Sequence, residues 1–147
     1  MIRALKVEEL PQVVPMFHDY YASSTVPHQF MDAELQTFLT RILTQHQGAL
    51  LVADSGGQLA GFALLYLTYE TRAMKPLTIL NDLFVAAPFR QQGLARALTA
   101  ASGDWAKAQG CEEMIWQTRT TNIGAQHLYD QVATREAGWI HYAQRLE

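Results

Sequence analysis

Apolar residues recur at helical spacing over residues 7–17 and again over residues 35–43. Steps of three and four residues place such side chains on one face of a helix, so both stretches predict amphipathic helices. The second helix is expected to run from Asp32, a good N-cap residue, to about residue 47, where Gly48 follows as a stop signal. The side chains expected on its buried face are Leu35, Phe38, Leu39, Ile42 and Leu43.

The pattern changes to strand type in the middle of the chain. Apolar runs over residues 49–54 and 59–69 flank a short turn at residues 55–58 that contains two glycines, and this arrangement predicts a β-hairpin. A third apolar run of strand type covers residues 78–85, and residues 2–5 are expected to form a short first strand. These segments predict an antiparallel meander beside the helical pair.

The rest of the chain alternates between helix and strand patterns. Helical patterns cover residues 92–109 and 123–132, and strand-type runs cover residues 114–118 and 139–146. A meander followed by alternating strands and helices predicts an α/β fold with a mixed sheet covered by helices. At 147 residues, the whole chain (1–147) is expected to form a single domain.

Composition limits the classes of function. Hydrophobic residues make up 49% of the chain and charged residues 17%, which suits a folded core and not a disordered chain. The formal net charge of −3 offers no basic face for phosphates, so we expect no nucleic-acid partner. The sequence contains neither a signal peptide nor an apolar run long enough to cross a membrane, which predicts a cytoplasmic protein without a membrane partner.

The segment with the most informative chemistry joins the strand over residues 78–85 to the helix that follows. It reads Arg90-Gln91-Gln92-Gly93-Leu94-Ala95, with Arg96 next. A helix N-terminus presents unpaired backbone N–H groups, and a glycine lets a phosphate approach the backbone, so this turn is a candidate pyrophosphate site. An ordinary strand-to-helix turn explains the same residues equally well. Arg90 and Arg96 either contact phosphate or are solvated at the surface.

These residues resemble the coenzyme-binding signature of the GCN5-related N-acetyltransferases, Arg/Gln-x-x-Gly-x-Gly/Ala. A second segment, Asn122-Ile123-Gly124-Ala125-Gln126-His127-Leu128-Tyr129, is similar to the Asn-x-x-Ala-x-x-x-Tyr motif of the same family. The phrase Asp82-Leu83-Phe84-Val85 and the aromatic closing segment look most like the branch of polyamine and diamine acetyltransferases. The likeness extends roughly from residue 59 to the C-terminus.

The resemblance implies a mostly antiparallel central sheet with one splayed parallel strand pair, flanked by helices. It implies acetyl-CoA as cosubstrate, no metal, and transfer of the acetyl group to a primary amine, of which a small cationic amine is favoured. It also implies a homodimer, with the closing segment as the place to look for the interface. The residues implied to bind the coenzyme are Leu83, Phe84 and Val85 through their backbone, Arg90, Gln91, Gln92, Gly93, Leu94, Ala95 and Arg96 at the pyrophosphate, and Asn122.

Two side chains are candidates for proton transfer. Tyr129 by itself is a typical core aromatic with a polar tip, whereas the resemblance implies that it is the general acid that protonates the departing CoA thiolate. Asp82 is the best-placed base for the substrate ammonium. A surface or ion-paired Asp82 explains the residue equally well, and a water chain is then the alternative route for the proton. The acid that often precedes this aspartate in the polyamine branch is Asn81 here. Strand alternation predicts that Asn81 and Asp82 lie on opposite faces of the sheet.

Other features carry less information. The five histidines show no metal-ligand spacing, and Cys111 is expected to be a buried, inert thiol. Phe17, Tyr20 and Tyr21, with Asp19, are expected either to line a cationic acceptor pocket or to pack in the core. Two alternative functions stay open: acetylation of a protein or peptide, and non-catalytic binding of acyl-CoA.

Overall fold

The computed structural model describes residues 1–26 and 28–146, so Pro27, which belongs to the polar stretch expected to end the first helix, lies outside the described residues. The chain divides into two compact units, Met1–Trp116 and Gln117–Glu147, and each is described by itself. The elements of the first unit are β1 (Ile2–Ala4), η1 (Val7–Glu9), α1 (Leu10–Ala22), α2 (Asp32–Thr44), β2 (Gly48–Ser55), β3 (Gln58–Glu70), β4 (Lys75–Val85), η2 (Ala87–Phe89), α3 (Leu94–Ala108) and β5 (Met114–Ile115). The second unit contains α4 (Ile123–Val132).

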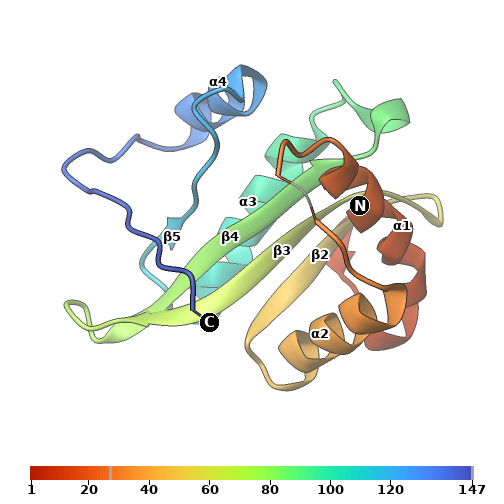
Figure 1. Cartoon of the computed structure of the whole chain (residues 1–147), viewed down its shortest axis with the longest axis horizontal. Helices are drawn as coiled ribbons and strands as arrows, with labels where there is room; N and C mark the ends of the chain where they lie inside the picture. The colour runs from red at the N-terminus through yellow and green to blue at the C-terminus, as the bar shows by residue number, and fades with distance from the viewer. Residues whose placement is uncertain (27, 147) are drawn as a thin grey trace. The chain divides into compact units, whose positions relative to one another are not determined.

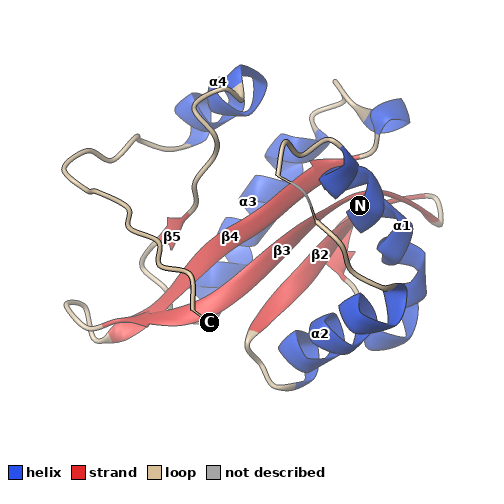
Figure 2. Cartoon of the chain, in the orientation of Figure 1, coloured by secondary structure: helices blue, strands red, loops and turns tan. Residues whose placement is uncertain are grey.

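The first unit is built on a mixed sheet of five strands in the order β1-β2-β3-β4-β5. All neighbouring pairs are antiparallel except β4 and β5, which are parallel. Figure 1 shows β2, β3 and β4 side by side, and Figure 2 shows α1 and α2 on one face of these strands and α3 on the other. The predicted mixed sheet covered by helices is therefore confirmed.

Each face of the sheet has its own apolar core. On the face covered by α1 and α2, the ring of Phe17 stacks on that of Phe62 with 4.2 Å between centroids. On the face covered by α3, Leu98 is completely buried among small and aliphatic strand residues. Because both faces are covered, the strands consist of nearly continuous apolar runs.

A β-bulge in β4 decides which side chains face which layer. The register of β3 and β4 pairs Leu64 with Asp82 but Leu65 with Leu80, so Asn81 is an extra residue in β4. Leu80 packs in the core under α3, whereas Phe84 packs in the core under α1 and α2. The inserted residue has shifted the alternation by one position. Asn81 and Asp82 consequently lie on the same side, where Asn81 Nδ2 donates to Asp82 Oδ2 at 3.0 Å, and the prediction of opposite faces was wrong.

The start of α2 also differs from expectation. Met31 and not Asp32 is the N-cap, and no side chain caps the helix from that position. The carboxylate of Glu34, three residues further along, accepts the Met31 N–H at 2.9 Å. A side chain within the helix thus provides the hydrogen bond for the backbone N–H of the N-cap residue. Leu39 and Ile42 are buried as predicted, but Phe38 is 39% exposed, so it lies outside the expected buried stripe.

The closing strand expected over residues 139–146 is absent, since the described residues from 134 to 146 contain no strand. β5 is also shorter than predicted, covering Met114–Ile115 in place of residues 114–118. A strand requires a neighbour for its backbone N–H and C=O groups, and apolar alternation in the sequence cannot supply that neighbour.

Two glycines provide a matched test of the packing. A Cβ on Gly48, at the start of β2, would lie 1.9 Å from the carbonyl oxygen of Leu65, whereas a Cβ on Gly103 in α3 would have nothing within 4 Å. Gly48→Ala is expected to lower the free energy of unfolding by about 1–3 kcal/mol, because the two backbones must move apart. Gly103→Ala is expected to raise it by about 0.5–1 kcal/mol through helix propensity. Urea unfolding of both variants measures the difference, and equal effects would contradict this close strand contact.

Candidate active site

The N-terminus of α3 has the form of an anion-binding site. Gly93 is its N-cap, with φ +78° in the left-handed region, and no side chain caps the first turn. Gln91, two residues earlier, also has a positive φ of 60°. The first helical hydrogen bond joins Ala97 N–H to the Gly93 carbonyl at 3.0 Å, so the preceding N–H groups of the helix point outward from its end. Backbone N–H groups and the positive end of the helix dipole suit a pyrophosphate.

The side chains around this turn hold it against β4. Arg90 Nε donates to the Val85 carbonyl at 3.0 Å, and its guanidinium lies 6.0 Å from the ring centroid of Phe84. Gln92 Nε2 donates to the Pro88 carbonyl at 3.5 Å. Arg96 is exposed in the first turn of α3. Arg90 therefore fixes the loop to the end of the strand, and the predicted residues Arg90 to Arg96 form the end of this loop and the start of α3.

The pairing of β4 with β5 is short. Only Thr78 with Met114 and Ile79 with Ile115 are paired, although β4 continues for six more residues to Val85. Among the described residues, that edge of β4 from Leu80 onward has no strand partner. Its backbone, including Leu83, Phe84 and Val85, can hydrogen-bond an extended ligand arm.

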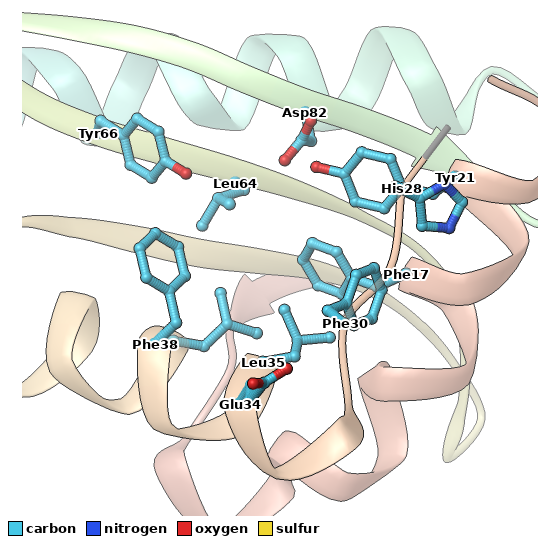
Figure 3. A pocket seen from close by; sticks show the side chains of 11 residues that line it. Phe17, Tyr21, His28, Phe30, Glu34, Leu35, Phe38, Leu64, Tyr66 and Asp82 are labelled. Atoms are coloured by element: carbon cyan, nitrogen blue, oxygen red, sulfur yellow. The ribbon is translucent and has the colours of Figure 1, made fainter. Parts of the chain in front are cut away.

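On the α1 and α2 side of the sheet lies a pocket of about 400 Å³. Five parts of the first unit form it: β3 and β4 provide the floor, and α1, the segment after it and α2 provide the walls (Figure 3). The lining residues are Phe17, Tyr21, His28, Phe30, Glu34, Leu35, Phe38, Leu39, Leu64, Tyr66 and Asp82. An apolar cavity with few polar groups is the usual form of a small-molecule site.

Asp82 is the buried acid of this pocket, with 6% of its surface exposed. Burial raises the pKa of the Asp82 carboxyl, and hydrogen bonds from the Asn81 and Tyr20 side chains oppose this rise without cancelling it. Two donors thus orient the carboxylate while the apolar surroundings increase its affinity for a proton. This combination is suitable for a group that accepts a proton from a bound substrate.

Two tyrosines flank this carboxylate. Figure 3 shows the hydroxyl groups of Tyr21 and Tyr66 pointing toward Asp82. Burial and the negative charge of Asp82 raise the pKa of Tyr21 to about 12, and the same causes raise the pKa of Tyr66. Both phenols therefore keep their protons at neutral pH and act as hydrogen-bond donors or acceptors, not as bases.

The α1 aromatic cluster contributes to both the core and the pocket. Phe17 is 1% exposed and belongs to the core while it also lines the pocket, and Tyr21 is half-buried in the pocket wall. Asp19 is exposed and does not line the pocket. The lining residues that sequence reasoning missed lie on other elements, namely His28, Phe30, Glu34, Leu64 and Tyr66, together with Phe38, which was expected in the core. The alternation of Leu64 and Tyr66 along β3 was the one signal that could have indicated two of them.

The second unit contains the other predicted motif. Asn122 is the N-cap of α4, and its Oδ1 accepts the Ala125 N–H at 3.1 Å, as predicted. Tyr129 lies two turns along the same helix and is partly buried. Burial raises the pKa of the Tyr129 phenol, so this side chain stays protonated at neutral pH.

The remaining candidates form no site of their own. Cys111 is buried, and its Sγ lies 3.2 Å from Thr78 Oγ1, in agreement with an inert thiol. Within residues 1–26 and 28–146, no three His, Cys, Asp or Glu side chains are grouped as metal ligands would be. In the same residues, no helix is both long and apolar enough to span a bilayer.

Comparison with known proteins decides the family. The model of the acetyltransferase (GNAT) family matches residues 12–133. The chain belongs to the GNAT acetyltransferase family. An uncharacterized N-acetyltransferase, YhfO of Bacillus subtilis (strain 168), is 33% identical over 142 residues, which cover 96% of this chain and 94% of the relative.

Other GNAT relatives act on different amines, as their names state. A thialysine N-epsilon-acetyltransferase of Caenorhabditis elegans is 32% identical over 95 residues, which cover 62% of this chain and 59% of that protein. The fold matches that of the aminoglycoside N-acetyltransferase AAC(6')-Iy in complex with CoA, with a TM-score of 0.83 and 24% identity over 99% of this chain and 95% of that one. The family match over residues 12–133 and the full-length N-acetyltransferase relative identify the protein as an acetyl-CoA-dependent N-acetyltransferase. These relatives do not confirm the predicted polyamine or diamine branch.

The role of Gly93 in coenzyme binding can be tested by one substitution. Gly93→Ala is expected to raise the Kd for CoA about tenfold, since the left-handed conformation costs an L-residue about 1–2 kcal/mol. A Cβ at this position would meet nothing within 4 Å, so the effect arises from the backbone. Titration calorimetry with CoA measures it, and Gly103→Ala in the same helix is the control. An unchanged Kd would indicate that the phosphates bind elsewhere.

Proposed function

We propose that this enzyme acetylates a small cationic primary amine that binds in the aromatic pocket with its nitrogen beside Asp82. The observation that carries the proposal is the buried Asp82 carboxylate, which lies on the floor of a pocket of about 400 Å³. A primary ammonium attracts an ionised carboxylate in this apolar setting much more strongly than it would in water. The same pairing places the nitrogen next to its proton acceptor.

The amine must lose a proton before it can attack. A primary ammonium has a pKa of about 10, so almost none of it is neutral at pH 7. The raised pKa of Asp82 reduces the mismatch between donor and acceptor, and the Asn81 and Tyr20 side chains keep the carboxylate in position. Asp82 accepts the ammonium proton, and the neutral nitrogen then attacks the thioester carbonyl carbon directly.

The coenzyme side of the proposal uses the N-terminus of α3 and the open edge of β4. The N–H groups that follow Gly93 hold the pyrophosphate, and the backbone of Leu83, Phe84 and Val85 holds the pantetheine arm. A backbone N–H of this edge polarises the thioester carbonyl and stabilises the negative charge that develops on its oxygen. The family match over residues 12–133 spans both units, which supports one catalytic domain.

Tyr129 completes the proton balance. As the carbon–sulfur bond breaks, the phenol donates its proton to the departing thiolate, and the raised pKa keeps that proton available at neutral pH. The amine loses two protons overall and the thiolate gains one, so each turnover releases one proton to solvent. No covalent enzyme intermediate is required.

A small amine is favoured over a protein acceptor because the pocket is bounded on several sides. Side chains of α1, α2, β3 and β4 all line it, whereas a peptide requires an open groove. The thialysine and aminoglycoside relatives also act on small amines, according to their names. The homodimer and the cytoplasmic location stay predictions.

The direct test is release of the CoA thiol from acetyl-CoA with a panel of amines. The panel contains diamines and spermidine, monoamines, amino acids, an aminoglycoside and a lysine peptide, and mass spectrometry identifies the acetylated product. Turnover on a small amine supports the proposal. Turnover on the peptide alone would establish the protein acetyltransferase, and binding of CoA without any turnover would establish the non-catalytic binder.

A further inference from the structure

The polar groups of the pocket are few and unequally placed. Of the eleven lining residues, only Asp82 and Glu34 carry a carboxylate. Asp82 is 6% exposed on the strand floor, whereas Glu34 is an exposed residue of α2. Figure 3 shows Glu34 on the opposite side of the pocket from Asp82. The depth of the pocket therefore contains a single carboxylate.

Glu34 already has a structural role. Its Oε2 accepts the Met31 N–H at 2.9 Å and so caps the free end of α2. The positive end of the helix dipole further stabilises its charge. A long dication, such as a polyamine, requires a second carboxylate that is available to it. The only candidate among the lining residues is this exposed, capping glutamate.

Aromatic side chains are the most frequent kind among the lining residues. Phe17, Tyr21, Phe30, Phe38 and Tyr66 line the pocket together with three leucines. The rings of Tyr21 and Phe30 pack edge-to-face at 5.8 Å between centroids, and His18 stacks on Phe30 at 4.7 Å. The ring faces and edges that remain inside the pocket suit another aromatic ring. The neutral hydrogen-bonding groups among the lining residues are the Tyr21 and Tyr66 hydroxyls and the His28 ring, which are fewer than the hydroxyl groups of an aminosugar.

We infer that the substrate class is an arylalkylamine, a primary amine separated from an aromatic ring by a short alkyl chain. The ammonium pairs with Asp82 on the floor, and the ring lies among Phe30, Phe38 and the leucines. This inference rests on the proposed function, because it places the acceptor nitrogen beside Asp82. A volume of about 400 Å³ accommodates one ring with a short alkyl chain.

The test compares kcat/KM for phenethylamine and tyramine with that for n-butylamine, putrescine, spermidine and an aminoglycoside. The arylalkylamines are expected to exceed every other amine by about tenfold or more, since each matched apolar contact contributes to transition-state binding. Phenethylamine and n-butylamine carry one charge each. The ratio of their kcat/KM values therefore measures the contribution of the aromatic ring and not that of the charge.

Two variants locate the specificity. Phe38→Ala is expected to lower kcat/KM for phenethylamine about tenfold, mainly by raising KM, with little change for n-butylamine. Phe38 is 39% exposed, so its removal should not unfold the protein. Tyr69→Ala, at an aromatic residue of β3 that is 79% exposed and outside the pocket, is the matched control. Glu34→Gln keeps the cap, because a Gln oxygen also accepts the Met31 N–H, and removes only the charge.

The possible outcomes separate the inference from the proposed function. A preference for putrescine or spermidine that Glu34→Gln abolishes would overturn the arylalkylamine class and leave amine acetylation intact. A preference for the aminoglycoside would do the same. If Phe38→Ala lowers kcat/KM equally for phenethylamine and n-butylamine, the aromatic side chains of the pocket do not recognise the substrate ring. If no small amine is acetylated while CoA binds, both the inference and the proposed function fail.

Discussion

Asp82→Asn is expected to lower kcat/KM for the best amine about a hundredfold at pH 7, because the variant has no group beside the ammonium that can take its proton. Asparagine keeps the shape of the side chain, and its carbonyl oxygen can still accept the hydrogen bond from Asn81. Steady-state kinetics with CoA thiol release measure the loss. Asp19→Asn is the matched control, since Asp19 is an exposed acid of α1 outside the pocket.

The pH dependence distinguishes a base from a residue that only shapes the pocket. In the wild type, kcat/KM is expected to rise with pH as the Asp82 carboxyl loses its proton, with an apparent pKa above the usual range of an aspartate. In Asp82→Asn, activity depends on amine that is already neutral, so it continues to rise toward the amine pKa near 10. The deficit of the variant should therefore shrink at high pH. A deficit that stays constant from pH 6 to pH 10 would contradict the role of Asp82 as base.

Stability is expected to change in the opposite direction from activity. Burial raises the pKa of Asp82 in the folded protein above its unfolded value, so the folded state binds this proton more tightly. The free energy of unfolding therefore decreases as pH rises from the unfolded pKa through the folded pKa. Above the folded pKa, the buried ionised carboxylate destabilises the folded state. Asp82→Asn should remove that cost, and its urea midpoint at pH 7 should equal or exceed that of the wild type.

Tyr129→Phe is expected to lower kcat about a hundredfold, with a smaller change in the KM for acetyl-CoA, because the departing thiolate loses its proton donor. Phenylalanine keeps the aromatic ring, so α4 should retain its packing and its Asn122 cap. Rapid-mixing measurements of thiol release give the rate of the chemical step. Burial raises the pKa of the Tyr129 phenol, so the wild-type kcat should not decline until the pH exceeds about 10, the ordinary tyrosine pKa.

Tyr142→Phe provides the control, since it removes the hydroxyl of another tyrosine in the same unit that is 84% exposed. Its kinetics should match the wild type. A Tyr129→Phe enzyme with wild-type kcat would exclude Tyr129 as the acid and leave it as a packing residue. A change confined to the KM for acetyl-CoA would assign the phenol to coenzyme binding.

The geometry of the turn that we propose for coenzyme binding could be predicted because its signals are local. The six residues Arg90 to Ala95 are contiguous, and the left-handed Gly93 and the uncapped helix that follows depend on their own sequence. The Asn122 cap is equally local, since its partner Ala125 is three residues away. Short-range geometry of this kind is nearly independent of the rest of the fold.

The pocket that we propose for the acceptor amine could not be predicted in the same way. In the sequence, Asn81 and Asp82 look like neighbouring residues of a regular strand, whose side chains alternate between the two faces. Nothing in their own segment reveals the extra residue that brings both side chains to one face. The bulge exists only relative to β3, where Leu64 and Leu65 pair with residues that are not adjacent to each other in β4. The predicted strand over residues 139–146 failed for the related reason that strand formation requires a partner.

The sequence by itself determined the helices, the hairpin, the glycine turn before α3 and the family signature, because each depends on residues within a few positions of one another. The tertiary structure decided which face Asp82 occupies, which aromatic side chains surround it and how its pKa is shifted. Those properties arise where segments from residue 17 to residue 82 meet. The packing of distant elements sets burial and electrostatic environment, and no local pattern encodes either.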